Sequence, residues 1–479
     1  MATFTEDWID WINENVSVGC DKNGIFKILL DEGFTHQQIR KQMNFEPLEN
    51  VASIVNPLRA KFEADRKKNQ TKEVRHTQDQ GIFLPNAEKL NSELADLYVI
   101  DNFLNQQECV KLVQLIEKMK RPSLMVNHDT KESTFRTSST CDLGQLNDPF
   151  VAEIDNRICK MIGIDSSYSE PLQGQFYDVG QEFKAHTDYF EADETSQMAN
   201  GRGQRTFTFF INLNNVEEGG ITHFPQLDFD HQPVMGTAII WNNLLPNDQG
   251  NFNTLHQGCP IIKGTKVIIT KWFRTKGQGP MLTKTPNEKV QNYSTIGFAK
   301  SSLAAPLYKR ISDFYHANHQ SHVEEFVDGD FINGTQTTCA PSSLLDLPSE
   351  LKQAVHDHMK PALEEWANTR LEPTYVYGIR TYHDTAKLKT HRDRLNTHII
   401  SCIINIYQDV EEDWPLQIED NYYRVHSVIM APGEVVFYES ARLNHGREIA
   451  MKGKAYANIF CHFKPVGYLS PCSSGLKSK

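Results

Sequence analysis

The stretch FYDVGQEFKAHTDYF at residues 176–190 decides the fold, because a related stretch, TYHDTAKLKTHRDRL, follows at residues 381–395. In each stretch a tyrosine, Tyr177 or Tyr382, precedes an H-x-D tripeptide at the same distance. Self-similarity at a long interval indicates a repeated structural unit. The sequence therefore predicts two tandem copies of one fold.

Short β-type runs surround the repeated stretches. INLNNVEEGGITHF (211–224) recurs as INIYQDVEEDWPLQI (404–418), and residues 106–119 have the apolar spacing of an amphipathic helix. Short strands at this density, separated by Gly, Asn and Asp turns, are typical of a jelly roll. We expect an α+β, mainly β fold of tandem double-stranded β-helix (jelly-roll) domains with flanking helices. In the first copy the expected strands are 97–103, 172–177, 206–213, 237–241 and 266–273.

The domain boundaries follow from shifts in composition. Residues 5–63 have helical apolar spacing, so the chain should begin with a small all-α domain. Its pattern resembles ubiquitin-associated three-helix modules, which leaves a packing domain and a ubiquitin reader as alternatives. Residues 64–80 are charged and almost without apolar side chains, which suits a linker. The predicted units are 1–80 (helices and linker), 81–277 (first double-stranded β-helix domain), 278–295 (linker) and 296–479 (second double-stranded β-helix domain).

Composition excludes several classes of partner. The chain has 479 residues and a net charge of −12, so it offers no basic field for a phosphate backbone and no nucleic-acid partner is expected. No apolar stretch approaches the roughly 18 residues of a membrane span, so no membrane partner is expected either. Nine scattered cysteines and an acidic start without a secretory signal predict a cytoplasmic location with reduced thiols.

The first H-x-D tripeptide is a candidate metal site. His186 and Asp188 end a strand-like run, and side chains alternate along a strand, so both should face one cavity. His256 comes from a later strand-like run. Two histidines and one carboxylate leave three positions open on Fe(II), enough for a bidentate co-substrate and dioxygen. The tripeptide alone would more often be a surface turn, and the residues that follow it favour the metal site.

Lys266 supplies the second half of that argument. It opens the apolar run KVIITKWF, where a buried charge needs a partner. A dicarboxylate suits it: the 5-carboxylate of 2-oxoglutarate would pair with Lys266 while the other end of the molecule chelates iron. The hydroxyl groups of Tyr177 and Thr222 could donate to the same carboxylate.

Residues 97–276 resemble the prolyl 4-hydroxylase family, particularly its plant and algal members. The motifs that carry the resemblance are RTSS (136–139), Tyr177, HTD (186–188), GQR (203–205), VEEGGIT (216–222), HQGCP (256–260), Lys266 and KWF (271–273). The resemblance implies hydroxylation of proline in a peptide or protein, with Fe(II), dioxygen, 2-oxoglutarate and ascorbate. It places Arg136, Arg205 and Trp272 near the peptide. Phe183 stands where a substrate-side tyrosine is usual, and Arg274 where a histidine is usual, so peptide specificity should differ.

The second copy repeats the ligand set as His391, Asp393 and His445. Its co-substrate lysine is displaced: aligning Gly453 with Gly264 places Ala455 opposite Lys266 and puts Lys454 on the other face of the strand. Arg380 or Arg447 could hold a dicarboxylate instead. The sequence leaves open whether this copy binds metal or is a degenerate structural or partner-binding unit.

Three functional readings remain from sequence alone. The first is a peptidyl-prolyl hydroxylase. The second keeps the chemistry but changes the substrate to a free amino acid or another side chain. The third is a non-enzymatic oxygen or metabolite sensor, or a scaffold in which the N-terminal helices recruit a partner.

Overall fold

A computed structural model of the chain divides it into two compact units, Met1–Gln78 and Asp79–Lys479. It describes residues 4–17, 19–31, 33–47, 54, 57, 82–123, 136–190, 201–325, 327, 331–335 and 340–470. The charged stretch 64–80, predicted to be a linker, lies outside the described residues. No described helix combines the length and the apolar character that crossing a membrane requires.

In its described residues the N-terminal unit contains three short helices, α1 (Glu6–Ser17), α2 (Lys22–Asp31) and α3 (His36–Met43). Thr35 caps α3 in a reciprocal arrangement with Gln38, which satisfies backbone groups that would otherwise lack partners. Phe26 and Leu29 are fully buried in a small core with Phe34. This apolar core is the reason that the helices hold together.

Two main antiparallel sheets make up the first half of the larger unit. The eight-stranded sheet has the order β1-β2-β11-β7-β14-β5-β4-β3, the four-stranded sheet the order β10-β9-β12-β6, and β13 pairs with β8. The strands are β1 (Ala87–Lys89), β2 (Leu97–Ile100), β3 (Arg121–Pro122), β4 (Ser139–Cys141), β5 (Gln173–Tyr177), β6 (Phe183–His186), β7 (Arg205–Asn212), β8 (Glu218–Gly219), β9 (Thr222–Phe224), β10 (Phe229–His231), β11 (Ala238–Asn242), β12 (His256–Gly258), β13 (Ile261–Lys263) and β14 (Lys266–Arg274).

Alternation along the central strands separates two cores. Phe209 of β7 and Ile269 of β14 belong to the core beneath α5 (Gln106–Met119) and α6 (Pro149–Ile162). Phe210 and Ile268, one position away, belong to a second core that also contains Phe224 of the four-stranded sheet. Residues of β14 with the parity of Lys266 therefore face the space between the two sheets.

The helices begin and end where the sequence provides caps. Asn105 caps α5, Asp148 caps α6, and α6 ends at Gly163, whose φ of 76° suits glycine. The helix predicted at 106–119 has those bounds. The strand predicted at 97–103 ends at Ile100 instead, because Asn102 adopts a left-handed φ of 55° that no strand can accommodate.

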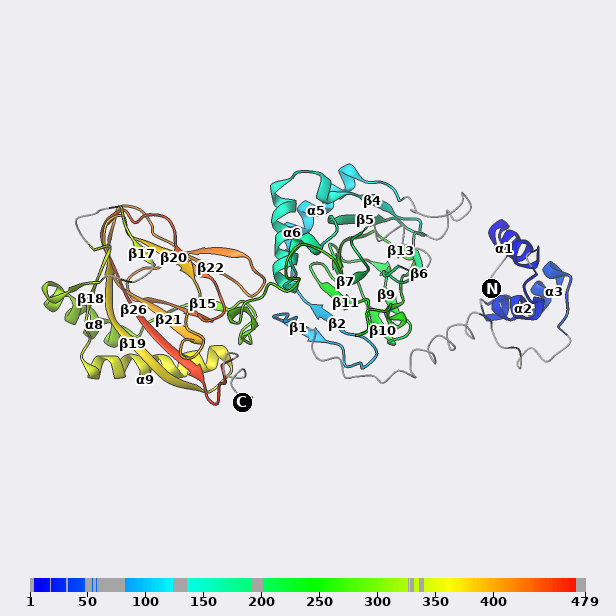
Figure 1. Ribbon diagram of the computed structural model, residues 1–479. Helices are drawn as coiled ribbons and strands as arrows, with labels where there is room; N and C mark the ends of the chain where they lie inside the picture. The colour runs from blue at the N-terminus through cyan, green and yellow to red at the C-terminus, as the bar shows by residue number, and fades with distance from the viewer. Residues whose placement is uncertain are drawn as a thin grey trace. The chain divides into compact units, whose positions relative to one another are not determined.

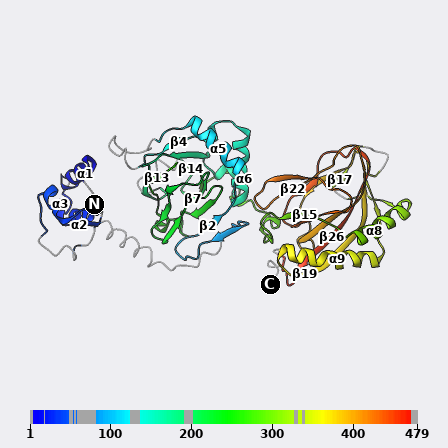
Figure 2. The ribbon, with the colours of Figure 1, turned by 180° about the vertical axis from the view of Figure 1, so that it is seen from behind.

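The second half of the larger unit also contains two antiparallel sheets. Their orders are β15-β24-β21-β26-β19-β18-β16 and β17-β20-β25-β22-β23. Helices α8 (Ala305–Asn318) and α9 (Ser349–Ala367) pack on the seven-stranded sheet, as both views show (Figures 1 and 2). The strands are β15 (Phe298–Ser302), β16 (Val323–Glu325), β17 (Ile332–Asn333), β18 (Ser342–Leu345), β19 (Leu371–Tyr382), β20 (Lys387–His391), β21 (Ile400–Val410), β22 (Leu416–Glu419), β23 (Val425–Val428), β24 (Glu434–Tyr438), β25 (His445–Arg447) and β26 (Gly453–Pro465).

The strand order of the first half recurs in the second. The run β11-β7-β14-β5 corresponds to β24-β21-β26-β19, and β9-β12-β6 corresponds to β22-β25-β20. In both halves the strand that carries the first histidine pairs with the strand that carries the second. The described chain is therefore β-rich with flanking helices, as the sequence predicts.

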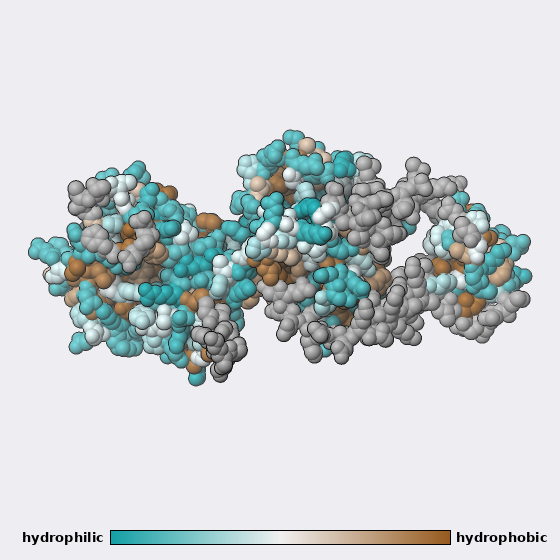
Figure 3. Space-filling view, viewed as in Figure 1, coloured by the Kyte–Doolittle hydropathy of each residue, from teal (hydrophilic) through white to brown (hydrophobic). Residues whose placement is uncertain are grey.

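Apolar side chains are scattered over the visible surface and do not form one large patch, as Figure 3 shows by the small separate brown areas among teal residues. All seven cysteines in the described part of the chain are free thiols. The buried apolar surface of the sheets, and not disulfide bonding, holds these residues together.

Candidate active site

The two histidines of the first triad face each other across neighbouring strands. His256 of β12 pairs with His186 of β6, and their rings lie 4.3 Å apart between centroids. The Nδ1 atom of His186 contacts the Lys184 carbonyl oxygen at 2.8 Å, and that of His256 contacts the Thr254 carbonyl oxygen at 3.0 Å. Donation from Nδ1–H fixes the tautomer that leaves Nε2 as the free lone pair. Both rings are thus oriented as metal ligands.

Asp188 completes the triad. One potential ligand atom from each of His186, Asp188 and His256 lies within 4.8 Å of the others. The hydroxyl of Thr208, on β7, donates to Asp188 Oδ2 at 2.6 Å, which leaves Oδ1 for a metal. Thr208 has no signal in the sequence that marks it as part of the site.

The protonation states suit a cation site. Burial and the neighbouring His256 lower the pKa of His186 to about 3. Burial tends to raise the pKa of Asp188, but the neighbouring His256 and His186 outweigh it and hold that pKa below its usual value. At neutral pH His186 is therefore neutral and Asp188 ionised, the forms that bind a metal ion.

Lys266 lies in the same cavity as the triad, which Tyr177, Thr222 and Trp272 also line. Its amino group is buried and donates to the Gly220 carbonyl oxygen at 2.7 Å and to the Thr222 hydroxyl oxygen at 3.0 Å. No described carboxylate forms an ion pair with it, and burial lowers its pKa to about 7. A buried cation with only neutral partners is costly, so this end of the cavity is built to receive an anion.

Tyr177 lies directly opposite Lys266 in the pairing of β5 with β14. Its buried hydroxyl donates to Gln175 Oε1 at 2.8 Å. The sequence-predicted donors Tyr177, Thr222 and Lys266 are therefore brought together, and Gln175 is an addition that the sequence did not single out.

Phe183 lies beside the metal ligands and lines the same cavity. Its ring stacks on His186 with centroids 3.6 Å apart, and the Arg136 guanidinium lies 5.0 Å from its centroid. The Arg136 guanidinium donates to the Ser138 hydroxyl at 3.1 Å. Arg136 and Phe183 thus form one wall beside the triad.

Arg205 and Arg274 share one acid, Glu170. Arg205 makes a two-pronged contact with the Glu170 carboxylate at 2.7 and 2.8 Å, and Arg274 approaches it at 2.8 Å. Arg205 also lies 4.0 Å over the Trp272 ring, whose buried Nε1 has no hydrogen-bond partner among the described residues. One carboxylate between two guanidinium groups leaves a net positive charge here, and sequence reasoning missed Glu170.

The second triad has the same geometry. His445 of β25 pairs with His391 of β20, the ring centroids lie 4.3 Å apart, and ligand atoms of both lie within 4.8 Å of Asp393. The Nδ1 atoms contact the carbonyl oxygens of Lys389 and Leu443 at 2.8 and 2.9 Å, so each Nε2 is again free. Burial and His391 lower the pKa of His445 to about 4.

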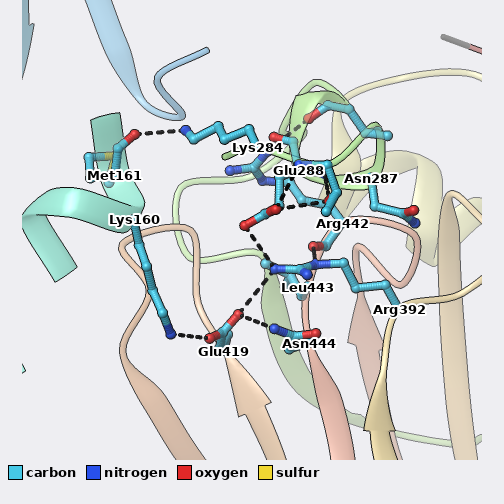
Figure 4. Close-up of polar contacts among 12 residues, drawn as sticks. Lys160, Met161, Lys284, Asn287, Glu288, Arg392, Glu419, Arg442, Leu443 and Asn444 are labelled. Atoms are coloured by element: carbon cyan, nitrogen blue, oxygen red, sulfur yellow. Dashed lines mark hydrogen bonds and ion pairs between the residues drawn. The ribbon is translucent and has the colours of Figure 1, made fainter. Parts of the chain in front are cut away.

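Ion pairs hold Arg392, the residue between two of the candidate metal ligands of the second triad (Figure 4). Arg392 stands between His391 and Asp393, and its guanidinium lies 3.2 Å from Glu288 and 3.5 Å from Glu419. Lys160 of α6 reaches the other oxygen of Glu419 at 3.2 Å. The second triad is therefore supported by contacts that extend to a helix of the first half.

The expected second-site lysine does not reach its cavity. The pairing of β26 places Tyr456, and not Ala455, opposite Tyr382, because register shifts in β26 and β21 add a residue relative to the first copy. The alignment of Ala455 with Lys266 is therefore wrong by one position. Lys454 is 85% exposed and pairs with Asp409, so it stays out of the cavity as expected, although for this different reason.

Comparison with known proteins identifies the superfamily and the family of this chain. Residues 172–274 match the family model of the 2OG-Fe(II) oxygenase superfamily. The chain is 34% identical over 198 residues to probable prolyl 4-hydroxylase 3 of Arabidopsis thaliana, a match that covers 37% of this chain and 68% of that protein. Probable prolyl 4-hydroxylase 10 of the same plant is 33% identical over the same shares. The chain belongs to the prolyl 4-hydroxylase family.

Animal relatives match over a smaller share of their length. Prolyl 4-hydroxylase subunit alpha-1 of Gallus gallus is 31% identical over 174 residues, 35% of this chain and 34% of that protein. The chain thus spans about a third of the length of that subunit. Among solved structures, the viral collagen prolyl hydroxylase of Paramecium Bursaria Chlorella virus-1 in complex with 2OG is 26% identical, with 38% of this chain and 96% of that chain covered and a TM-score of 0.31.

Proposed function

We propose that the chain hydroxylates proline in a peptide or protein at the site of His186, Asp188 and His256. One oxygen atom of dioxygen enters the proline, and the other enters succinate as 2-oxoglutarate loses carbon dioxide. The observation that carries the proposal is the combination of a three-ligand metal site with Lys266, a buried cation in the same cavity to which the described residues offer no acidic partner.

The triad fits Fe(II). Two imidazole Nε2 atoms and one carboxylate oxygen converge, and each side chain is oriented by a hydrogen bond at its other polar atom, which donates in the histidines and accepts in Asp188. This donor set is typical of Fe(II) oxygenases and leaves open positions for other ligands. Iron supplies the activation of dioxygen, and the protein supplies the geometry and a dry cavity.

Lys266, Tyr177 and Thr222 fit the distal carboxylate of 2-oxoglutarate. All three line the cavity that also contains the triad, and together they offer an ammonium group and two hydroxyl groups. Their role is to hold the co-substrate so that its other end reaches the metal. We include ascorbate as a reductant that keeps iron in the ferrous state.

The substrate side consists of Arg136, Phe183, Arg205, Trp272 and Arg274. Trp272 has an indole N–H that no described residue accepts, which suits a peptide carbonyl, and Phe183 offers an apolar face for a pyrrolidine ring. The relatives named as prolyl 4-hydroxylases support proline as the target. Because Phe183 and Arg274 differ from the residues usual in the family at these positions, the preferred peptide sequence should differ from that of other members.

We extend the proposal to architecture and location. The recurring strand order supports two tandem double-stranded β-helix domains, 81–277 and 296–479, joined by 278–295 and preceded by an all-α domain within 1–80. The free thiols of the described part support a reducing, cytoplasmic location.

The test uses the full chain with Fe(II), ascorbate, 2-oxoglutarate and a library of proline-containing peptides, analysed by mass spectrometry. Gain of one oxygen atom on proline is the expected result, together with its loss in His186→Ala. Oxidation only at other residues, or only of free amino acids, would replace proline by the second substrate class.

A further inference from the structure

Strand pairing places the residues of the two cavities in correspondence. His256 pairs with His186 as His445 pairs with His391. Lys266 pairs with Tyr177 as Tyr456 pairs with Tyr382. The position of the first-site lysine is thus occupied in the second site by a tyrosine, and any cation there must come from another strand.

Arg447 comes from the strand of the second histidine. It follows His445 by two residues, so both side chains leave β25 on the same face. It pairs with Leu388 as Gly258 pairs with Phe183 in the first copy. A glycine beside the first triad is therefore replaced by an arginine beside the second.

The two cations donate to carbonyl groups at matching positions. Lys266 donates to the Gly220 carbonyl oxygen, and Arg447 donates to the Trp414 carbonyl oxygen. Gly220 lies two residues before Thr222 of β9, and Trp414 lies two residues before Leu416 of β22. Strands β9 and β22 pair in the same way with the strand of the second histidine. The Arg447 guanidinium thus donates to the carbonyl group that corresponds to the one bound by the Lys266 ammonium.

Arg447 has no acidic partner among the described residues. It is 2% exposed, its second donor group lies 3.4 Å from the Tyr456 hydroxyl, and its guanidinium lies 4.7 Å from the Trp414 ring centroid. A buried guanidinium surrounded by neutral groups carries an uncompensated charge, as Lys266 does. A buried charge of this kind suits a site that binds an anionic ligand.

The other two candidate cations, Arg380 and Lys454, already form ion pairs with carboxylates. Arg380 lines the second cavity, but the Glu325 carboxylate holds it through two contacts of 2.6 and 2.7 Å. Lys454 lies at the surface with Asp409. Of the three cations considered for the second site, Arg447 is the one without a carboxylate partner.

Tyr382 provides an independent observation. It is fully buried and lines the second cavity together with His391, Asp393 and His445, and its hydroxyl interacts with Arg380 without a well-aligned hydrogen bond. A buried hydroxyl whose hydrogen bond is poorly aligned is costly unless a ligand completes it. Tyr177, its counterpart, is one of the donors proposed for 2-oxoglutarate in the first site.

We propose that the second half is a second metal site that binds a 2-oxo dicarboxylic acid, with Arg447 and Tyr382 on the distal carboxylate and His391, Asp393 and His445 on the metal. Arginine from β25 replaces lysine from the strand equivalent to β14. The site is distinct from the proposed prolyl site, because its residues all lie in 296–479.

The experiment uses the full chain with the first site disabled by His186→Ala and Asp188→Ala, and titrates Mn²⁺ and then 2-oxoglutarate by calorimetry. One Mn²⁺ per chain is expected, against two in the unmodified protein. Arg447→Ala should weaken 2-oxoglutarate binding by roughly tenfold or more while metal binding persists, and Arg447→Lys should restore part of it. Lys454→Ala is the matched control, with no expected change.

Tyr382→Phe is a second variant that guards against loss of folding, because it removes only a hydroxyl group and keeps the buried ring. It should weaken 2-oxoglutarate binding by roughly threefold to tenfold with the metal stoichiometry unchanged. Absence of the second Mn²⁺, or equal 2-oxoglutarate affinity in Arg447→Ala, Tyr382→Phe and their parent, would overturn the proposal. These outcomes leave the prolyl site untouched, since that site is disabled in every protein compared.

Discussion

Replacement of Lys266 by methionine should weaken binding of 2-oxoglutarate and, at the same time, increase the stability of the protein. Lys266 is 3% exposed, and its ammonium group has a carbonyl and a hydroxyl as partners but no described carboxylate. A hydrogen bond to a charged group in such a place is worth roughly 1.5 to 3 kcal/mol. Losing it should raise the KM for 2-oxoglutarate roughly ten- to hundredfold.

The same substitution should stabilise the protein when no co-substrate is present. Methionine has a similar volume and needs no hydrogen bond, so it removes a buried charge without opening a cavity. We expect the free energy of unfolding to rise by roughly 1 to 4 kcal/mol. Lys266→Arg should keep the charge and part of the affinity.

The assay pairs initial rates of succinate release with urea unfolding, for the unmodified protein, Lys266→Met and Lys263→Met. Lys263 is a matched control, because it lies three residues before Lys266 while its side chain is 70% exposed and pairs with Glu217. A KM in Lys266→Met equal to that of the control would refute the assignment of Lys266. A loss of stability would refute the view that its charge lacks compensation.

Three further predictions follow from contacts in the two sites. Burial lowers the pKa of Lys266 to about 7, so carboxylate binding takes up a proton, and 2-oxoglutarate should bind up to roughly tenfold more weakly per pH unit above that value; affinity independent of pH would contradict this. Thr208→Val removes the hydroxyl that orients Asp188 and should weaken Mn²⁺ binding roughly ten- to hundredfold in a calorimetric titration, whereas an unchanged affinity would remove its positioning role. Glu419→Gln should lower the free energy of unfolding by roughly 1 to 3 kcal/mol in urea, and the exposed Glu412→Gln by less than about 0.5 kcal/mol; equal effects would contradict the clamp on Arg392.

Local sequence patterns were sufficient for the strands expected in the first copy, apart from the end of 97–103, and for the convergence of the triads. The run KVIITKWF is mainly apolar, and β14 (Lys266–Arg274) is buried along its whole length. The H-x-D spacing places two ligands on one face of a strand whatever the surroundings are. The family resemblance is confirmed by the plant relatives.

Partners that come from distant elements could not be predicted from the sequence. Glu170 precedes β5 and bridges Arg205 and Arg274, which lie on two other strands. Nothing in the spacing of these residues marks them as neighbours, because only the order of strands in the sheet brings them together. The counterpart of Lys266 was placed one residue off for a related reason: the register shift beside Gly453 adds a residue to β26, and a single glycine does not by itself reveal such a shift.

The most direct test of the central claim follows both atoms of dioxygen. The full chain is incubated with Fe(II), ascorbate, 2-oxoglutarate, a proline peptide and oxygen-18 gas, beside an Asp188→Ala variant. One labelled atom in hydroxyproline and one in succinate, in equal amounts and absent from the variant, is the predicted result. Labelled succinate without labelled hydroxyproline for every peptide, or equal labelling in the variant, would contradict a prolyl hydroxylase site at His186, Asp188 and His256.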